Sequence, residues 1–164
     1  MKLLAMISAT VTGALLIAGA AHAQQTAARK LSEEAERGRY LVRIAGCNDC
    51  HTRGYAQSAG KVDESLWLTG DDMGWKGPWG TTYASNLRLT VKGMTAEQFV
   101  KHARSEFRPP MPWFNLRDMR DRDVKAIYHY LKHLGPAGNP APAYVPPGKK
   151  PKGPFIEFPA PPKP

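Results

Sequence analysis

Cysteine is scarce in this chain: the 164 residues include only two, Cys47 and Cys50. Two thiols exclude the framework of several disulfides that stabilises many small exported domains, and they supply only half of a four-ligand zinc site. Acidic residues are also few, with 14 Asp and Glu against 23 Lys and Arg, so the net charge is +9. The chain is therefore basic, and a core of this size needs stabilisation from something other than disulfides.

Long apolar runs are missing after residue 24, so no later segment is expected to cross a membrane. The one such run spans residues 3–20, follows Lys2 and precedes Ala21-His22-Ala23, whose small residues suit a signal peptidase. We predict a signal peptide over residues 1–23, cleavage after Ala23, and a periplasmic protein that is soluble once cleaved. An uncleaved membrane anchor stays open as an alternative, because the run is long enough to span a bilayer.

The two cysteines stand in the segment Cys47-Asn48-Asp49-Cys50-His51. The Cys-x-x-Cys-His spacing is typical of covalent haem attachment. Both thiols must reach the vinyl groups on one porphyrin edge, and the histidine that follows must turn back to the iron. The alternatives are a redox dithiol, which needs no histidine, and half of a zinc site, which needs further ligands at matching spacing. We predict one covalent haem c, with Cys47 and Cys50 as thioether residues and His51 as an axial ligand.

Three helices are predicted from capping residues and from apolar side chains at helical spacing. The first follows Ser32, the second follows a capping box of Thr95 and Gln98, and the third spans about residues 121–134. Gly38 lies in the middle of the first helix, where glycine costs stability. Its presence indicates that another backbone passes close to it, although a tolerated surface glycine explains it equally well.

The stretch from Thr52 to Leu87 has no regular periodicity and is rich in glycine and tryptophan. This composition predicts loops laid over a large apolar body such as haem. The segment Leu66-Trp67-Leu68 forms either a short turn packed on the ring or part of a separate small core. Tyr83, Asn86 and Arg88 are candidates to hydrogen-bond or pair with the haem propionates.

Met111 lies in the segment Arg108-Pro109-Pro110-Met111-Pro112. Prolines on both sides exclude helix and hold the methionine in an extended loop, which fixes the direction of its thioether. We predict Met111 as the second axial ligand, because iron held by histidine and methionine gives a high-potential electron carrier. Met94 and Met119 are the other candidates for this ligand, whereas Met73 is too close to the haem motif to reach the other face. Alternatively, Met111 is a core residue that does not bind the iron.

Three other histidines are candidate ligands. His102, on the second helix, is in principle able to bind iron, but a solvated or hydrogen-bonded histidine is the simpler interpretation. His129 and His133 lie one helical turn apart, which is metal-ligand spacing. Both flank the apolar stripe of the third helix, so we interpret them as surface residues.

The C-terminal stretch from residue 136 to 164 is rich in proline, with scattered lysines. Such a segment is expected to be extended and to form neither helix nor a central strand. It either wraps the folded body through Tyr144, Phe155, Ile156 and Phe158, or docks a partner, or is disordered.

The order of leader, helix, Cys-x-x-Cys-His, glycine-rich loops, helix, Pro-Met-Pro loop and final helix resembles a class I c-type cytochrome over about residues 32–134. The resemblance implies an all-α, cytochrome c-like fold, with three main helices and glycine-rich loops around one covalent haem. It also implies Cys47, Cys50, His51 and Met111 as the haem-binding residues. In that family the first and last helices cross closely, and Gly38 and Tyr128 are placed for such a contact.

Three short segments also make the chain similar to cytochrome subunits of periplasmic dehydrogenases: Ser85-Asn86-Leu87, Met111-Pro112-Trp113 and Ala126-Ile127-Tyr128. The chain departs from many class I members because no proline occurs between His51 and Pro78. Many class I members have a proline after the haem motif, and the residues near it supply a carbonyl that accepts from the second ring nitrogen of the proximal histidine. The sequence therefore does not identify the acceptor for His51.

We therefore expect a leader at 1–23, a cytochrome c domain at 24–135 and a Pro/Lys-rich extended tail at 136–164. The expected function is single-electron transfer, without bond chemistry, between a periplasmic donor such as a dehydrogenase and a respiratory acceptor such as a terminal oxidase. The basic surface favours acidic redox protein partners, and an exported chain is not expected to bind nucleic acid. Membrane attachment is expected only with an uncleaved leader.

Two other functions stay open. One is a haem-based gas sensor or peroxide-reactive protein with an open distal site, for which His102 and Arg108 are the candidate polar groups. The other is an anchored subunit of a respiratory assembly that passes electrons without diffusing.

Overall fold

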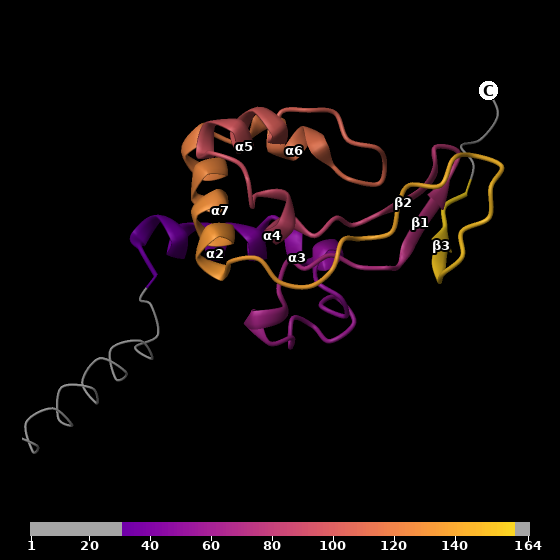
Figure 1. Ribbon diagram of the computed structural model, residues 1–164, viewed down its shortest axis with the longest axis horizontal. Helices are drawn as coiled ribbons and strands as arrows, with labels where there is room; N and C mark the ends of the chain where they lie inside the picture. The colour runs from indigo at the N-terminus through magenta and orange to yellow at the C-terminus, as the bar shows by residue number, and fades with distance from the viewer. Residues whose placement is uncertain (1–30, 160–164) are drawn as a thin grey trace, which may run out of the picture. The chain divides into compact units, whose positions relative to one another are not determined.

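The computed structural model describes residues 31–159, so the predicted leader at 1–23 and the last five residues lie outside the described range. The elements of this range are, in order, α2 (Glu33–Ile44), α3 (Cys47–His51), the 3-10 helix η1 (Glu64–Leu66), β1 (Gly74–Gly77), β2 (Gly80–Tyr83), α4 (Leu87–Thr90), α5 (Ala96–Ala103), α6 (Trp113–Asp118), α7 (Asp121–Leu134) and β3 (Phe155–Glu157). Figure 1 labels all of them except η1. Among these helices, none combines the length and the apolar character that a membrane span requires.

Helix α2 begins where its cap predicts, because the side chain of Ser32 accepts a hydrogen bond from the amide of Ala35 at 3.2 Å. The same holds for α5, whose capping box is complete: Thr95 and Gln98 each bond the other's backbone amide. Such caps satisfy amides that have no partner inside the helix.

Helix α2 packs against α7 at Gly38. A Cβ atom at Gly38 would lie 2.6 Å from the carbonyl carbon of Ala126 and 2.8 Å from the Cβ of Tyr130. The prediction of a close backbone at Gly38 is therefore confirmed. The predicted partner, Tyr128, is wrong: its hydroxyl donates to the Met94 carbonyl at 2.7 Å and its ring lies beside Phe99.

A polar cluster connects three elements beside this helix crossing. Arg39 of α2 donates to both carboxylate oxygens of Glu64 in η1, at 2.8 and 2.6 Å, and the hydroxyl of Tyr130 in α7 donates to Glu64 Oε1 at 2.7 Å. The Arg39 and Tyr130 bonds lower the pKa of Glu64, while burial opposes the shift. Burial and the bond to Glu64 raise the pKa of Tyr130, so its buried hydroxyl keeps its proton.

Two strands between α3 and α4 and one strand from the tail form a three-stranded sheet with the order β2-β1-β3. Strands β1 and β2 form an antiparallel hairpin, from Gly74 opposite Tyr83 to Gly77 opposite Gly80. Strand β3, from the proline-rich tail, pairs with β1 in parallel. The chain is thus helical with a small sheet, and the expectation of an all-α fold was wrong in omitting it.

The described part of the tail packs on this hairpin instead of being disordered. The backbone of Val145 exchanges two hydrogen bonds with that of Thr81, at 2.7 and 3.0 Å. Further along, the ring of Phe158 lies 6.0 Å from that of Trp75 and 5.4 Å from that of Trp79. The tail therefore runs along the outer edge of β2 and then reaches the outer edge of β1, and we call residues 141–159 the strap.

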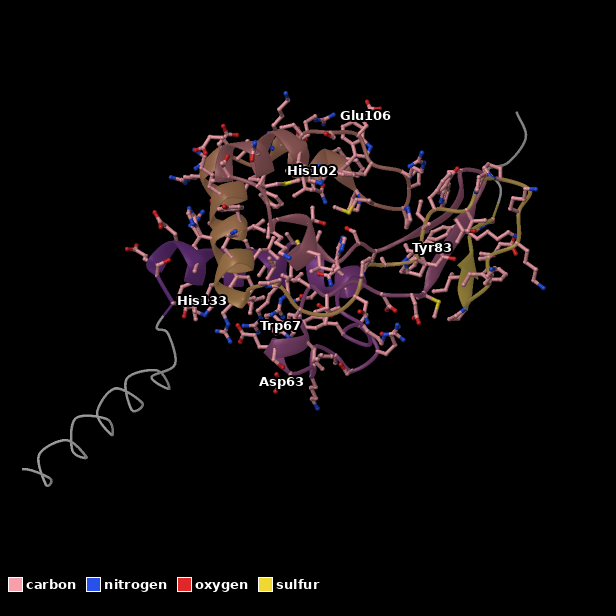
Figure 2. All side chains as sticks on the ribbon, viewed as in Figure 1. Asp63, Trp67, Tyr83, His102, Glu106 and His133 are labelled. Atoms are coloured by element: carbon pink, nitrogen blue, oxygen red, sulfur yellow. The ribbon has the colours of Figure 1, made fainter. Side chains whose placement is uncertain are left out.

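The segment around Trp67 belongs to the main hydrophobic core, since Trp67 and Leu68 cluster with buried residues of α2, α5 and α7. Trp67 and Leu68 are 6% and 0% exposed, whereas Leu66 is 57% exposed. The Trp67 ring makes an edge contact with Tyr55 at 5.6 Å, and its indole nitrogen donates to the Val62 carbonyl at 2.9 Å. Figure 2 shows Trp67 well apart from His102. Because Trp67 and Leu68 are part of the main core, the interpretation of this segment as a separate small core was wrong.

Candidate functional site

The Cys-x-x-Cys-His segment forms the single turn of helix α3, directly after α2. A buried chain of hydrogen bonds fixes this turn: the Leu68 amide donates to Thr52 Oγ1, and Thr52 Oγ1 donates to Asn48 Oδ1, both at 2.8 Å. Cys47, Cys50 and His51 all line one cavity of about 410 Å³. These buried hydrogen bonds hold the motif in a conformation that places both sulfurs and the imidazole on the same cavity.

His51 is 7% exposed, and its Nδ1 lies 2.7 Å from the carbonyl oxygen of Ser85. A carbonyl only accepts hydrogen bonds, so Nδ1 carries the hydrogen and the lone pair of Nε2 is free for a metal. Burial lowers the pKa of His51, which keeps the ring neutral, although the Ser85 bond opposes this shift. Ser85 is therefore the acceptor that the sequence left unidentified.

Gly70 allows this contact to form. Its amide donates to the His51 carbonyl at 2.8 Å, and a Cβ atom at this position would lie 2.9 Å from both the Ala84 carbonyl oxygen and the Asn86 amide nitrogen. Its φ of +83° also favours glycine. The backbone on both sides of Ser85 can approach the motif only because residue 70 has no side chain.

Met111 contributes to the same cavity from the loop between α5 and α6. Figure 1 shows this loop extending towards the hairpin, where Thr82 Oγ1 donates to the Pro109 carbonyl at 2.7 Å. Among the methionines of residues 31–159, only Met111 lines the cavity. The rivals Met94 and Met119 pack against the main hydrophobic core instead.

The rest of the lining is mostly apolar and comes from the hairpin, from the helices α4 to α7, from the Met111 loop and from the tail. Besides Cys47, Cys50, His51 and Met111, the lining residues are Trp75, Thr82, Tyr83, Ala84, Ser85, Leu87, Thr90, Phe99, His102, Ala103, Phe107, Arg108, Pro110, Pro112, Leu116, Ile127, Pro142 and Tyr144. The apolar walls of this cavity suit a haem macrocycle. Its two thiols suit the vinyl groups, and its neutral imidazole and its thioether suit the iron. The residues present thus fit the predicted cofactor.

The thiols do not resemble those of a redox dithiol. Burial raises the pKa of Cys47 to about 11 and also raises the pKa of Cys50. Catalytic dithiols depend on a lowered thiol pKa, because the thiolate is the reactive form. The environment of α3 therefore disfavours that alternative.

The three propionate candidates have different outcomes. Tyr83 lines the cavity. Arg88 is 6% exposed and donates to the carbonyls of Ser65, Leu134 and Gly135, which closes the C-terminal end of α7. Asn86 caps α4 and donates to two carbonyls of the tail. Arg88 and Asn86 do not line the cavity, so their role is structural.

Two polar residues of the open-site alternative do line the cavity. His102 of α5 makes an edge contact with the ring of Phe107 at 5.3 Å, and the Arg108 guanidinium lies 4.1 Å from the centre of the Tyr144 ring. Figure 2 shows His102 on the helical side of the site and Tyr83 on the hairpin side. His129 and His133 are absent from the cavity lining, and residues 31–159 contain no group of three or more metal-binding side chains.

Sequence reasoning missed the contribution of the tail to this site. Pro142 and Tyr144 are cavity residues, and the hydroxyl of Tyr144 donates to the Trp79 carbonyl at 2.7 Å. The only signal for this role is an aromatic residue inside a proline-rich stretch.

Comparison with known proteins gave one family and two relatives. The family model described as Cytochrome c matches residues 35–135. The cytochrome c subunit of the quinone-dependent alcohol dehydrogenase of Gluconobacter oxydans is 30% identical over 129 residues, which are 70% of this chain and 23% of that protein. The fructose dehydrogenase cytochrome subunit of Gluconobacter japonicus is 30% identical over 153 residues, 83% of this chain and 30% of that protein.

This chain therefore spans less than a third of each of these relatives. No solved structure matches the chain.

Proposed function

Because the chain belongs to the cytochrome c family, we propose that it carries single electrons between a periplasmic donor, such as a dehydrogenase, and a respiratory acceptor. It contains haem c, the covalent cofactor of that family, which supplies one iron that alternates between the ferric and ferrous states. The observation that carries the proposal is that one cavity brings the Cys-x-x-Cys-His turn together with the proline-framed Met111.

In this proposal Cys47 and Cys50 form the thioether bonds, and His51 and Met111 bind the iron on its two faces. The bond from His51 Nδ1 to Ser85 fixes the ring and directs Nε2 at the iron. A neutral thioether on the other face favours the ferrous state and closes the iron to substrates. The chain then transfers electrons and catalyses no bond chemistry of its own.

A dehydrogenase donor is supported by the two relatives, both of which are named as cytochrome subunits of dehydrogenases. The donor would reduce the haem in the periplasm, and a respiratory component such as a terminal oxidase would take the electron. The signal peptide at 1–23 belongs to the same proposal, since haem is attached to such motifs outside the cytoplasm.

Acidic redox proteins are the partners that the charge distribution favours. Arg108 at the cavity and Lys149, Lys150 and Lys152 on the strap have no ion-pair partner within residues 31–159. Unpaired positive charge steers an acidic surface towards the protein and raises the association rate.

The ferric absorption spectrum of haem-loaded protein tests the proposed ligands. Sulfur on ferric iron gives a weak absorption band at long wavelength. We expect this band in the wild type and in Met73→Ala, which removes a half-buried methionine that does not line the cavity. We expect Met111→Ala to lose it. A band that survives Met111→Ala would reject Met111 as the ligand.

A haem-based sensor or peroxide-reactive protein is the second candidate. The observation that favours it is the presence of His102 and Arg108 on the cavity lining, where they would lie near a ligand bound to an open iron. It requires that Met111 stay off the iron, and it predicts rapid binding of small ligands by the ferrous protein.

A further inference from the structure

The strap forms part of the cavity that the proposed function assigns to haem. Pro142 and Tyr144 line this cavity although they lie beyond residue 135, where the match to the family model ends. The next residue, Val145, is tied to Thr81 of β2 by two backbone hydrogen bonds. The position of Tyr144 is therefore fixed by the hairpin.

Tyr144 connects three segments that are distant in the sequence. Its hydroxyl donates to the carbonyl of Trp79 in the hairpin turn at 2.7 Å. Its ring lies under the Arg108 guanidinium at 4.1 Å, which is a cation–π distance. Gly80 makes room for it, because a Cβ atom there would lie 2.9 Å from the Tyr144 hydroxyl and 3.0 Å from its ring.

Arg108 stands three residues before Met111 in a loop with few backbone bonds of its own. Three of the residues from 108 to 112 are prolines, which have no amide hydrogen. The backbone bonds recorded near Met111 are local ones that begin α6, such as the Trp113 amide to the Met111 carbonyl at 2.8 Å. The contacts from Thr82 to Pro109 and from Tyr144 to Arg108 thus tie the start of the loop to the hairpin and the strap.

We propose that Tyr144 is a positioning residue for the sixth ligand of the haem iron. The strap holds Tyr144 against the hairpin, the Tyr144 ring holds Arg108, and Arg108 sets how closely the Met111 thioether approaches the iron. This inference rests on the proposed ligation by Met111. It assigns to the proline-rich tail a part in the redox site and not only in the fold.

The test compares variants of the full, haem-loaded protein by the long-wavelength ferric band and by the midpoint reduction potential. Tyr144→Leu removes both the ring under Arg108 and the hydroxyl. Tyr144→Phe removes only the hydroxyl and keeps the stacked ring. Tyr40→Leu is the matched control, since Tyr40 is 58% exposed on α2 and is not a cavity residue.

We expect Tyr144→Leu to lose most of the band and to have a lower potential, because a weaker iron–sulfur bond stabilises the ferrous state less. Tyr144→Phe should keep most of the band, and Tyr40→Leu should match the wild type. Arg108→Gln breaks the same contact from the other side, so it should reproduce Tyr144→Leu, and the double variant should add little to either change. If the Tyr144→Leu protein fails to bind haem, Arg108→Gln still tests the inference.

Two results overturn the inference. If the wild type shows the band and both Tyr144→Leu and Arg108→Gln keep it at full strength, Tyr144 does not position Met111, while the proposed function stands. If the wild type itself lacks the band, the ligation by Met111 fails, and the inference fails with it.

Discussion

His51 shows how much of the site is decided by backbone groups. Its ring nitrogen bonds the carbonyl of Ser85, its own carbonyl accepts from the Gly70 amide, and the segment around Ser85 passes directly over Gly70. The Cys-x-x-Cys-His pattern does not predict that Gly70 and Ser85 contact His51. The pattern predicts which atoms face the haem, and contacts with residues 19 and 34 positions later fix how the imidazole is turned.

A methyl group at residue 70 should therefore disturb the proximal side of the site. We expect Gly70→Ala to destabilise the haem-loaded protein by about 1–3 kcal/mol, because it combines overpacking against backbone with a strained positive φ. Thermal or denaturant unfolding of the ferric protein measures this effect.

The matched control is Gly93→Ala, since an added Cβ there meets nothing within 4 Å and no positive φ is involved. It should change stability by less than about 1 kcal/mol. Equal stability of the Gly70→Ala and Gly93→Ala proteins would contradict the tight packing at His51.

Among the elements, the helices were more predictable than the strands. The caps at Ser32 and Thr95 and the glycine after α7 are local signals, and each helix begins or ends there in the structure. The hairpin has strands of four residues, and β3 reaches β1 from about 80 residues later. Pairing over such a distance leaves no local pattern, so a glycine-rich stretch was interpreted as loops.

The burial of Tyr130 also depends on a residue that is distant in the sequence. Tyr130 is fully buried because Glu64, 66 residues away, accepts its hydroxyl hydrogen, and Ala126 and Tyr130 form a second buried face of α7 towards α2. The apolar side chains at helical spacing, Val124, Ile127 and Leu131, mark a different face of this helix. A tyrosine beside that stripe is compatible with either solvent or a buried partner, so helical periodicity alone does not decide its place.

The cluster that connects α2, η1 and α7 makes stability depend on pH. Its carboxylate, Glu64, has a folded pKa below the ordinary value of 4.5, chiefly because of the Arg39 hydrogen bonds. A depressed carboxyl pKa stabilises the fold fully above 4.5, and the stabilisation is lost as the pH falls below that value towards the folded pKa.

We expect Glu64→Gln to lower the melting temperature at neutral pH and to reduce the loss of stability on acidification below about pH 4.5. Thermal unfolding as a function of pH measures both effects. The control is Glu106→Gln, an exposed carboxylate with no ion pair among residues 31–159. An acid profile of Glu64→Gln identical to that of Glu106→Gln would show that this cluster does not set the pH dependence.

For the molecule as a whole, unpaired lysines of the described chain lie on two different sides. Lys149 and Lys150 lie on the strap beside the hairpin, whereas Lys132 lies on α7 and Lys92 near it. Figure 1 shows the hairpin and α7 at opposite sides of the described part of the chain. Composition predicts a basic protein, but the side on which the charge acts depends on the path of the strap.

The rate of oxidation by ferricyanide, an anionic oxidant, tests the steering effect without a known partner. We expect Lys149→Glu with Lys150→Glu to slow this reaction at low salt by about 3- to 10-fold, because negative charge on the strap repels the anion. The same change should speed oxidation by a cationic cobalt complex. Stopped-flow absorbance measures both rates.

The control is Lys92→Glu with Lys132→Glu, which changes the net charge equally on the α7 side. It should slow the ferricyanide reaction less, and high salt should remove the difference between the two pairs. Equal effects of both pairs would mean that net charge alone matters and that the strap does not steer the encounter.

We propose above that Met111 closes the iron to outside ligands and so makes the protein an electron carrier. Carbon monoxide binding to the ferrous, haem-loaded protein tests this most directly. We predict that carbon monoxide leaves the wild-type ferrous spectrum unchanged, while Met111→Ala binds it readily. A wild type that binds carbon monoxide as readily as Met111→Ala would contradict the claim and would favour ligand sensing or peroxide chemistry at an open site beside His102.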